Sequence, residues 1–218
     1  MGLFDRFKKP TQQSTANSFN LIYELLFCDN IALYKLHNQQ PSVYPWNILL
    51  DENSSSAELQ QIINDTSLET RAKILAYNKL RTASQPIDKK ELLAVIVEVG
   101  MDEGLDVLAS FKDGTARYLN HSGSMIILET TDAASNELTN QLFAESEKIV
   151  KQIGSWDKPR RPQPAKGNAR ISFLVSDGLY FGEAPLNTLF SDPIAAHALQ
   201  SATALMQYIT QRATQKIS

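Results

Sequence analysis

The residues best suited to chemistry are Asp106, Arg117 and His121, which lie in one stretch of alternating apolar and polar residues. If Asp113-Gly114 forms a two-residue turn, the flanking strands pair Asp106 directly with His121. A carboxylate in that position orients an imidazole and raises its pKa, as a general base requires. The same pattern describes an exposed cross-strand ion pair that contributes roughly a few tenths of a kcal/mol. Because no Ser, Thr or Cys nucleophile is tied to the pair by sequence, the surface ion pair is the simpler interpretation.

Motifs for metal and cofactor chemistry are absent from the sequence. The three histidines form no HxH or HxxxH pair, and there is no GxxxxGK[ST], GxGxxG or GxSxG motif. One group of acidic residues could in principle hold Mg²⁺ or Ca²⁺: Glu98, Asp102, Glu103 and Asp106. Their spacing is not that of an EF-hand, and a turn between strands explains them equally well. We therefore expect no metal and no cofactor, and the absence of motifs favours a non-catalytic protein over an enzyme.

Residues 158–170 form a proline-rich connector with local positive charge. An extended segment of this kind can contact an anion or an acidic partner, and a solvent-exposed loop is the alternative. The formal net charge of the chain is −3, and Trp156 is the aromatic residue near the connector, so the pattern argues against a nucleic-acid surface. The candidate contact residues are Lys158, Arg160, Arg161, Lys166 and Arg170.

The first ten residues have the pattern of a short interfacial helix. Apolar side chains can lie on one side while cations face anionic lipid headgroups. The candidate membrane contacts are Leu3, Phe4, Phe7, Lys8 and Lys9. This predicts a weak peripheral membrane contact, with a tail that merely aids solubility as the alternative.

The sequence predicts a cytoplasmic protein. Peripheral association with the inner face of the membrane is the alternative within this prediction. The single cysteine, Cys28, lies in an apolar run and suits a reducing compartment. No apolar run has the length of a transmembrane helix, and the N-terminus lacks the apolar core of a signal peptide.

The expected fold is α+β, with a four-stranded antiparallel meander and a later hairpin in one antiparallel or mixed sheet packed by helices. We divide the chain into a tail (1–17), a helical region (18–85) and a sheet domain (86–218), or a single domain joining the last two. Capping patterns predict helices that start within Ser54–Ser56, at a Thr66–Glu69 capping box, at Asp132 and at Asp192. The run 92–99 is apolar on both faces, which predicts a central strand.

Asp-Gly and Ser-Gly pairs predict the strand register. A two-residue turn at Asp113-Gly114 pairs Ala109 with Tyr118 on a core face that also holds Phe111 and Ile127. The opposite face then carries Asp106, Arg117 and His121. In the last hairpin, a turn at Asp177-Gly178 pairs Val175 with Tyr180.

Two segments, TRAKILAYNKLR at 70–81 and ELLAVIVEVGMDEGLDVLASFKDGTARYLNHSG at 91–123, resemble a family of uncharacterised bacterial proteins. The resemblance implies a bacterial source. It implies no activity, substrate or site residue.

Three functions are compatible with these features. The first expectation is a binding or adaptor module that presents one face of its sheet to a protein partner or to a second copy of itself. The alternative is a small-molecule sensor that holds a ligand between sheet and helices. The third is an enzyme that uses Asp106 and His121, with Arg117 beside them.

Overall fold

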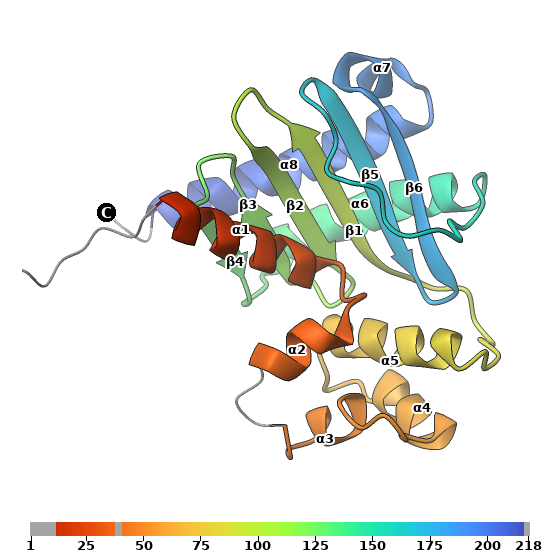
Figure 1. The fold of residues 1–218 in the computed structure, drawn as a ribbon. Helices are drawn as coiled ribbons and strands as arrows, with labels where there is room; N and C mark the ends of the chain where they lie inside the picture. The colour runs from red at the N-terminus through yellow and green to blue at the C-terminus, as the bar shows by residue number, and fades with distance from the viewer. Residues whose placement is uncertain (1–11, 38–40, 216–218) are drawn as a thin grey trace, which may run out of the picture.

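The protein folds around a six-stranded antiparallel sheet with the strand order β4-β3-β2-β1-β5-β6, which confirms the predicted α+β class (Figure 1). The computed structural model describes residues 12–37 and 41–215. The strands are β1 (Leu92–Gly100), β2 (Leu105–Phe111), β3 (Ala116–Leu119), β4 (Met125–Leu128), β5 (Asn168–Val175) and β6 (Gly178–Pro185).

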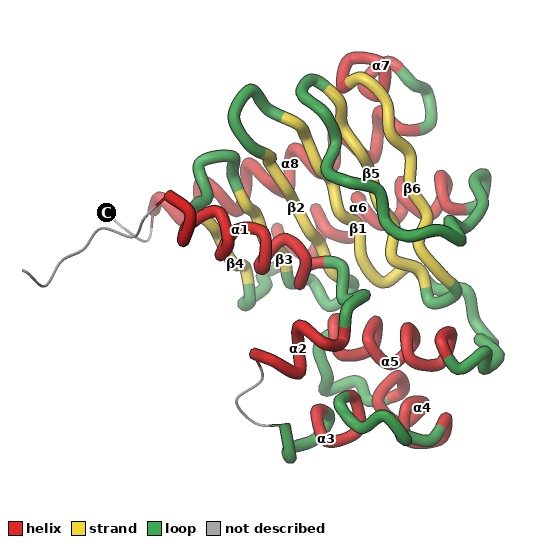
Figure 2. Tube along the Cα trace, viewed as in Figure 1, coloured by secondary structure: helices red, strands yellow, loops and turns green. Residues whose placement is uncertain are grey.

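Helices cover both faces of the sheet. Before the sheet come α1 (Gln12–Leu26), α2 (Ile31–His37), α3 (Trp46–Leu49), α4 (Ser56–Asn64) and α5 (Thr70–Thr82). Later come α6 (Ala133–Val150), α7 (Leu186–Ser191) and α8 (Ala195–Gln215). Helix α1 crosses one face of the sheet, α2 to α5 gather beside it, and α6 and α8 lie across the opposite face (Figures 1 and 2).

Strand β1 lies inside the sheet and is covered on both sides, as its two-sided apolar pattern predicts. Ile96 belongs to the core shared with α1 and α5, whereas Val95 and Val97 belong to the core shared with α6 and α8. All three side chains are buried. Helices therefore cover both faces of the sheet at this strand.

The predicted register of β2 and β3 is also wrong, by one residue. Lys112, Asp113 and Gly114 form a three-residue loop in which the Phe111 N–H donates to the Thr115 carbonyl (2.9 Å) and Gly114 has φ +87°. This is the type I turn followed by a left-handed glycine, in place of the type I′ turn. The strands therefore pair Ala109 with Arg117 and Leu108 with Tyr118.

A slip of one residue moves side chains to the other face. Tyr118 consequently faces α8, and Arg117 faces the side of α1. The β3–β4 turn repeats the three-residue form, with Gly123 at φ +83°, and it sets Tyr118 opposite Ile126 instead of Ile127.

The last hairpin differs from its predicted register by two residues. Ser176 and Asp177 make the turn, so that Val175 pairs with Gly178 and Phe173 pairs with Tyr180. A shift of two preserves the face on which each side chain lies. The predicted inward position of Tyr180 is confirmed, since this side chain is 4% exposed.

Two of the predicted helix starts are confirmed, at Ser55 and at Asp132. Each cap is a capping box in the structure, Ser55 with Glu58 and Asp132 with Ser135. The predicted capping box at Thr66 and Glu69 is wrong. Helix α5 instead begins at Thr70, whose backbone N–H donates to the Asp113 carboxylate in the β2–β3 turn (2.6 Å). The cap comes from a residue far away in the sequence, so no local pattern signals it.

The proposed membrane segment, residues 1–10, lies outside the described residues. None of the helices within the described ranges 12–37 and 41–215 combines the length and the hydrophobicity that a transmembrane span needs. Cys28 is buried and free.

Candidate functional site

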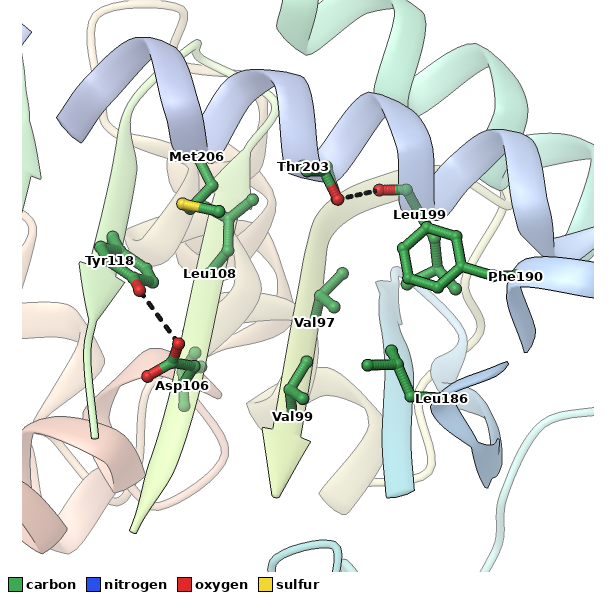
Figure 3. Close-up of a pocket in the computed structure, with 12 residues that line it drawn as sticks. Val97, Val99, Asp106, Leu108, Tyr118, Leu186, Phe190, Leu199, Thr203 and Met206 are labelled. Atoms are coloured by element: carbon green, nitrogen blue, oxygen red, sulfur yellow. Dashed lines mark hydrogen bonds between the residues drawn. The ribbon is translucent and has the colours of Figure 1, made fainter. Parts of the chain in front are cut away.

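A narrow cavity lies between the sheet and the helices α7 and α8, with a volume of about 180 Å³. We call it the slot (Figure 3). Strands β1, β2 and β3 form its floor, and α8 forms its opposite wall. The lining is apolar except for Asp106, the Tyr118 hydroxyl and Thr203, and it consists of Val97, Val99, Asp106, Val107, Leu108, Tyr118, Leu186, Phe190, Leu199, Ala202, Thr203 and Met206.

The alternation of β1 and β2 explains this lining. Val97 and Val99 point to the α8 face of β1, and Asp106 and Leu108 point to the same face of β2. Asp106 therefore lies on the same face of β2 as the buried Leu108, at a position where the strand pattern would place an apolar side chain. The result is a carboxylate in the wall of an otherwise apolar cavity.

Asp106 is held by three neighbouring donors. Its Oδ1 accepts a hydrogen bond from the His121 backbone N–H (2.7 Å) and lies 3.0 Å from His121 Nδ1. Its Oδ2 accepts a hydrogen bond from the Tyr118 hydroxyl (3.1 Å), which Figure 3 shows as a dashed line. Burial, and then the negative charge of Asp106, raise the pKa of Tyr118 to about 12, so this phenol stays protonated and donates.

A wider recess adjoins the slot at the end of the sheet, with a volume of about 530 Å³. The two cavities share Val99 and Leu186 as lining residues. The polar side chains of the recess are Asp102, Glu103, His121 and Lys166, and Lys166 pairs with Asp102 (2.7 Å). Ligand that entered the slot from this side would pass a mouth with more acidic than basic groups.

The structure brings together two of the three residues proposed as a chemical cluster. The Asp106–His121 contact forms, although the two residues are not cross-strand partners, because the carboxylate reaches into the β3–β4 turn. Arg117 does not join them: it lies on the α1 face, 7% exposed, and donates to the Ala116 carbonyl (3.3 Å). The nearby Ser122 hydroxyl bonds to Asn120 (2.8 Å).

The arginines of the connector face carboxylates of the same chain. Arg160 pairs with Glu24 and with Asp29 (2.8 Å) and stacks over Phe27 at 4.0 Å. Arg170 is buried and pairs with Glu183 (2.9 Å). The connector thus lies along β5 and β6 and ties α1 to the sheet (Figure 2).

The remaining connector cations are more exposed. Arg161 is 53% exposed, 3.9 Å from Glu183, and Lys166 is 71% exposed in its pair with Asp102. Lys158 lies over the Trp156 ring at 5.6 Å. Contact of this segment with an outside anion stays a prediction.

Sequence reasoning missed the buried network around Glu98. This side chain is fully buried in β1; its Oε1 accepts a hydrogen bond from Tyr23 (2.7 Å) and lies 3.6 Å from Arg170. Among the described residues, nothing hydrogen-bonds to its Oε2. Burial raises the pKa of Glu98, and the Tyr23 hydrogen bond and the Arg170 charge oppose that rise without cancelling it. The network joins α1, β1 and β5 and lines neither cavity.

The slot and recess together suit binding. A small apolar group fits among the side chains of α7, α8 and the sheet, and a polar group can meet Asp106 and Tyr118 at one end. Asp106 also orients the His121 ring, so the site has the parts needed to accept or release a proton. In the part of the chain that the structure describes, no group of three or more His, Cys, Asp or Glu side chains could hold a metal ion.

The comparisons with known proteins add no site residue. No protein-family model matches the chain, and none of the curated proteins is significantly similar to it.

Proposed function

We propose that this protein is a non-catalytic binding protein for a small amphipathic molecule, which it holds in the slot between the sheet and α8. The observation that carries the proposal is the slot itself, an apolar cavity of about 180 Å³ with one carboxylate and one phenol at its edge. Ligand sites in proteins combine a mainly apolar lining with a few polar groups that fix orientation.

Ala202 offers a direct test, because it is 3% exposed and its side chain lines the slot from α8. Ala202→Leu places three more carbon atoms in the cavity. Their burial contributes up to about 2 kcal/mol, and strain from tighter packing costs about 1–3 kcal/mol, so the two effects are of similar size and opposite sign. We expect a variant of nearly unchanged stability in which the ligand no longer fits.

The measurement is the thermal shift of the full chain with a series of straight-chain amphiphiles, from hexyl to decyl, carrying amine, alcohol or carboxylate heads. A ligand at a hundred times its Kd stabilises the folded state by about 2.7 kcal/mol. The matched control is Ala204→Leu, the same change on the same helix outside the slot lining. If no amphiphile stabilises the wild type, or if Ala202→Leu and Ala204→Leu respond alike, the proposal fails.

The edge strand β4 favours a second candidate function, self-association as an adaptor. Met125 and Ile127 are 39% and 44% exposed, and the strand carries no charge. Among the described residues, β4 is the last strand of the sheet and pairs only with β3. Such an edge can pair with a second copy and extend the sheet. Light scattering would then show a dimer that Ile127→Lys disrupts and that Ile194→Lys, an equally exposed isoleucine on another surface, does not. A monomeric wild type at high concentration would exclude it.

A further inference from the structure

We propose that the ligand of the slot carries a positively charged amine head group, which pairs with Asp106. This inference rests on the proposed binding function and names the chemical class of the ligand.

Asp106 is a charged group whose own contacts leave room for a cation. Its donors are a backbone N–H, an imidazole and a phenol, from His121 and Tyr118. In the described part of the chain, no lysine or arginine forms an ion pair with it. A carboxylate offers about four acceptor positions, so one remains after these three contacts. The side chain is 25% exposed, which leaves it accessible from the cavity.

The charges around the recess favour a cation as well. Asp102 and Glu103 line it together with His121 and Lys166, and Lys166 is already paired with Asp102. Because Lys166 and Asp102 cancel each other, the carboxylate of Glu103 leaves the recess with a net negative charge, which attracts a cationic ligand. A carboxylate ligand would instead approach Asp106 with like charge, and that repulsion selects against it.

The apolar part of the slot suits an alkyl or aryl tail. Phe190 and Leu199 contribute large apolar side chains on one side of the slot, and Met206 lies beside Leu108 of β2 on the other (Figure 3). An ammonium group that leaves water for such a site must be paired, and Asp106 is the pairing group at hand. A primary amine on a short hydrocarbon chain meets both requirements.

The experiment compares octylamine, octanol and octanoate by isothermal titration calorimetry on the full chain. Hydrogen bonds between charged groups are stronger than those of a neutral hydroxyl, so we expect octylamine to bind about tenfold or more tightly than octanol. Octanoate should bind most weakly. Asp106→Asn should remove the preference for the amine while octanol still binds. Asp102→Asn, at the mouth, should change the preference by less than about twofold because its carboxylate is exposed and already paired.

Tyr118→Phe provides a second variant, since it frees Asp106 Oδ2 and keeps the carboxylate. It should retain the amine preference. Two results would overturn the inference and leave the proposed binding function in place. In the first, octanol and octanoate bind as tightly as octylamine; in the second, Asp106→Asn folds and keeps the preference for the amine. If none of the three compounds binds, the proposed function fails and the inference fails with it.

Discussion

Replacing Asp113 by alanine should destabilise the protein more than its place in a surface turn suggests. The Asp113 carboxylate accepts hydrogen bonds from the Thr70 N–H (2.6 Å), the Thr115 N–H (2.9 Å) and the Thr115 hydroxyl (2.7 Å). In return, the Asp113 N–H donates to the Thr70 hydroxyl (3.1 Å). One side chain therefore caps α5, shapes the β2–β3 turn and joins the helical region to the sheet.

The expected loss of stability follows from these contacts. Loss of a helix cap costs about 1 kcal/mol, with a range of about 0.5–2. The two bonds to Thr115 are partly exposed and contribute about 0.5–1 kcal/mol each. The sum, about 2–3 kcal/mol, lowers the melting temperature of a chain of this length by roughly 4–12 °C.

The effect should depend on pH. Burial alone would raise the pKa of Asp113, but the hydrogen bonds from Thr70 and Thr115 outweigh burial and hold the pKa below its ordinary value. A carboxyl group with a lowered pKa in the folded state stabilises the protein above its unfolded pKa, about 3.9, and that contribution fades as the pH falls through the folded value. The gap between wild type and Asp113→Ala should therefore narrow below about pH 3.9.

Urea unfolding followed by circular dichroism, at pH 7 and below pH 3.9, measures both effects. The control is Asp177→Ala, in the turn of the β5–β6 hairpin, whose carboxylate accepts a hydrogen bond from Tyr180 in its own hairpin (2.9 Å). We expect it to lose less than about 1 kcal/mol. The reasoning is refuted if Asp113→Ala costs no more than Asp177→Ala, or if its cost is the same at both pH values.

Two further predictions concern β1. A Cβ on Gly100 would lie 2.3 Å from the Ala165 carbonyl oxygen, so Gly100→Ala should lower the free energy of unfolding in urea by about 1–3 kcal/mol. Gly182→Ala is the control, because its Cβ would have open space around it, and it should leave the stability unchanged. Equal stabilities of the two variants would contradict the close approach at Gly100. Because burial raises the pKa of Glu98, its ionisation opposes folding as the pH rises through the unfolded value of about 4.3. The stability of Glu98→Gln relative to wild type, measured by urea unfolding, should therefore be higher at pH 8 than at pH 4. The reverse order would mean that the ion pair with Arg170 dominates.

The elements that the sequence predicted well are those with local signals. The apolar run of β1 and the helix starts at Ser55 and Asp132 depend on residues within a few positions of one another. The register of β2 and β3 was not predictable in the same way. An Asp-Gly pair suits a two-residue and a three-residue turn, and the bond between Asp113 and Thr70, 43 residues apart, accompanies the second form.

The candidate site shows the same division. The Asp106–His121 contact was predicted because both residues lie near one hairpin, and it forms even though the assumed register is wrong. Arg117 lies on the face opposite to Asp106 because a register shift of one residue moves the side chains of β3 to the other face of the sheet. The slot itself had no local signal, since its walls combine the meander with α7 and α8, which follow much later in the chain.

The most direct test of the binding proposal is a methyl NMR titration of the full chain with octylamine. We expect saturable shifts centred on the slot residues Val97, Leu199 and Met206, and the loss of these shifts in Ala202→Leu. Shifts centred on Met125 and Ile127 of β4, or no saturable shift at the slot, would contradict binding of an amine in the slot.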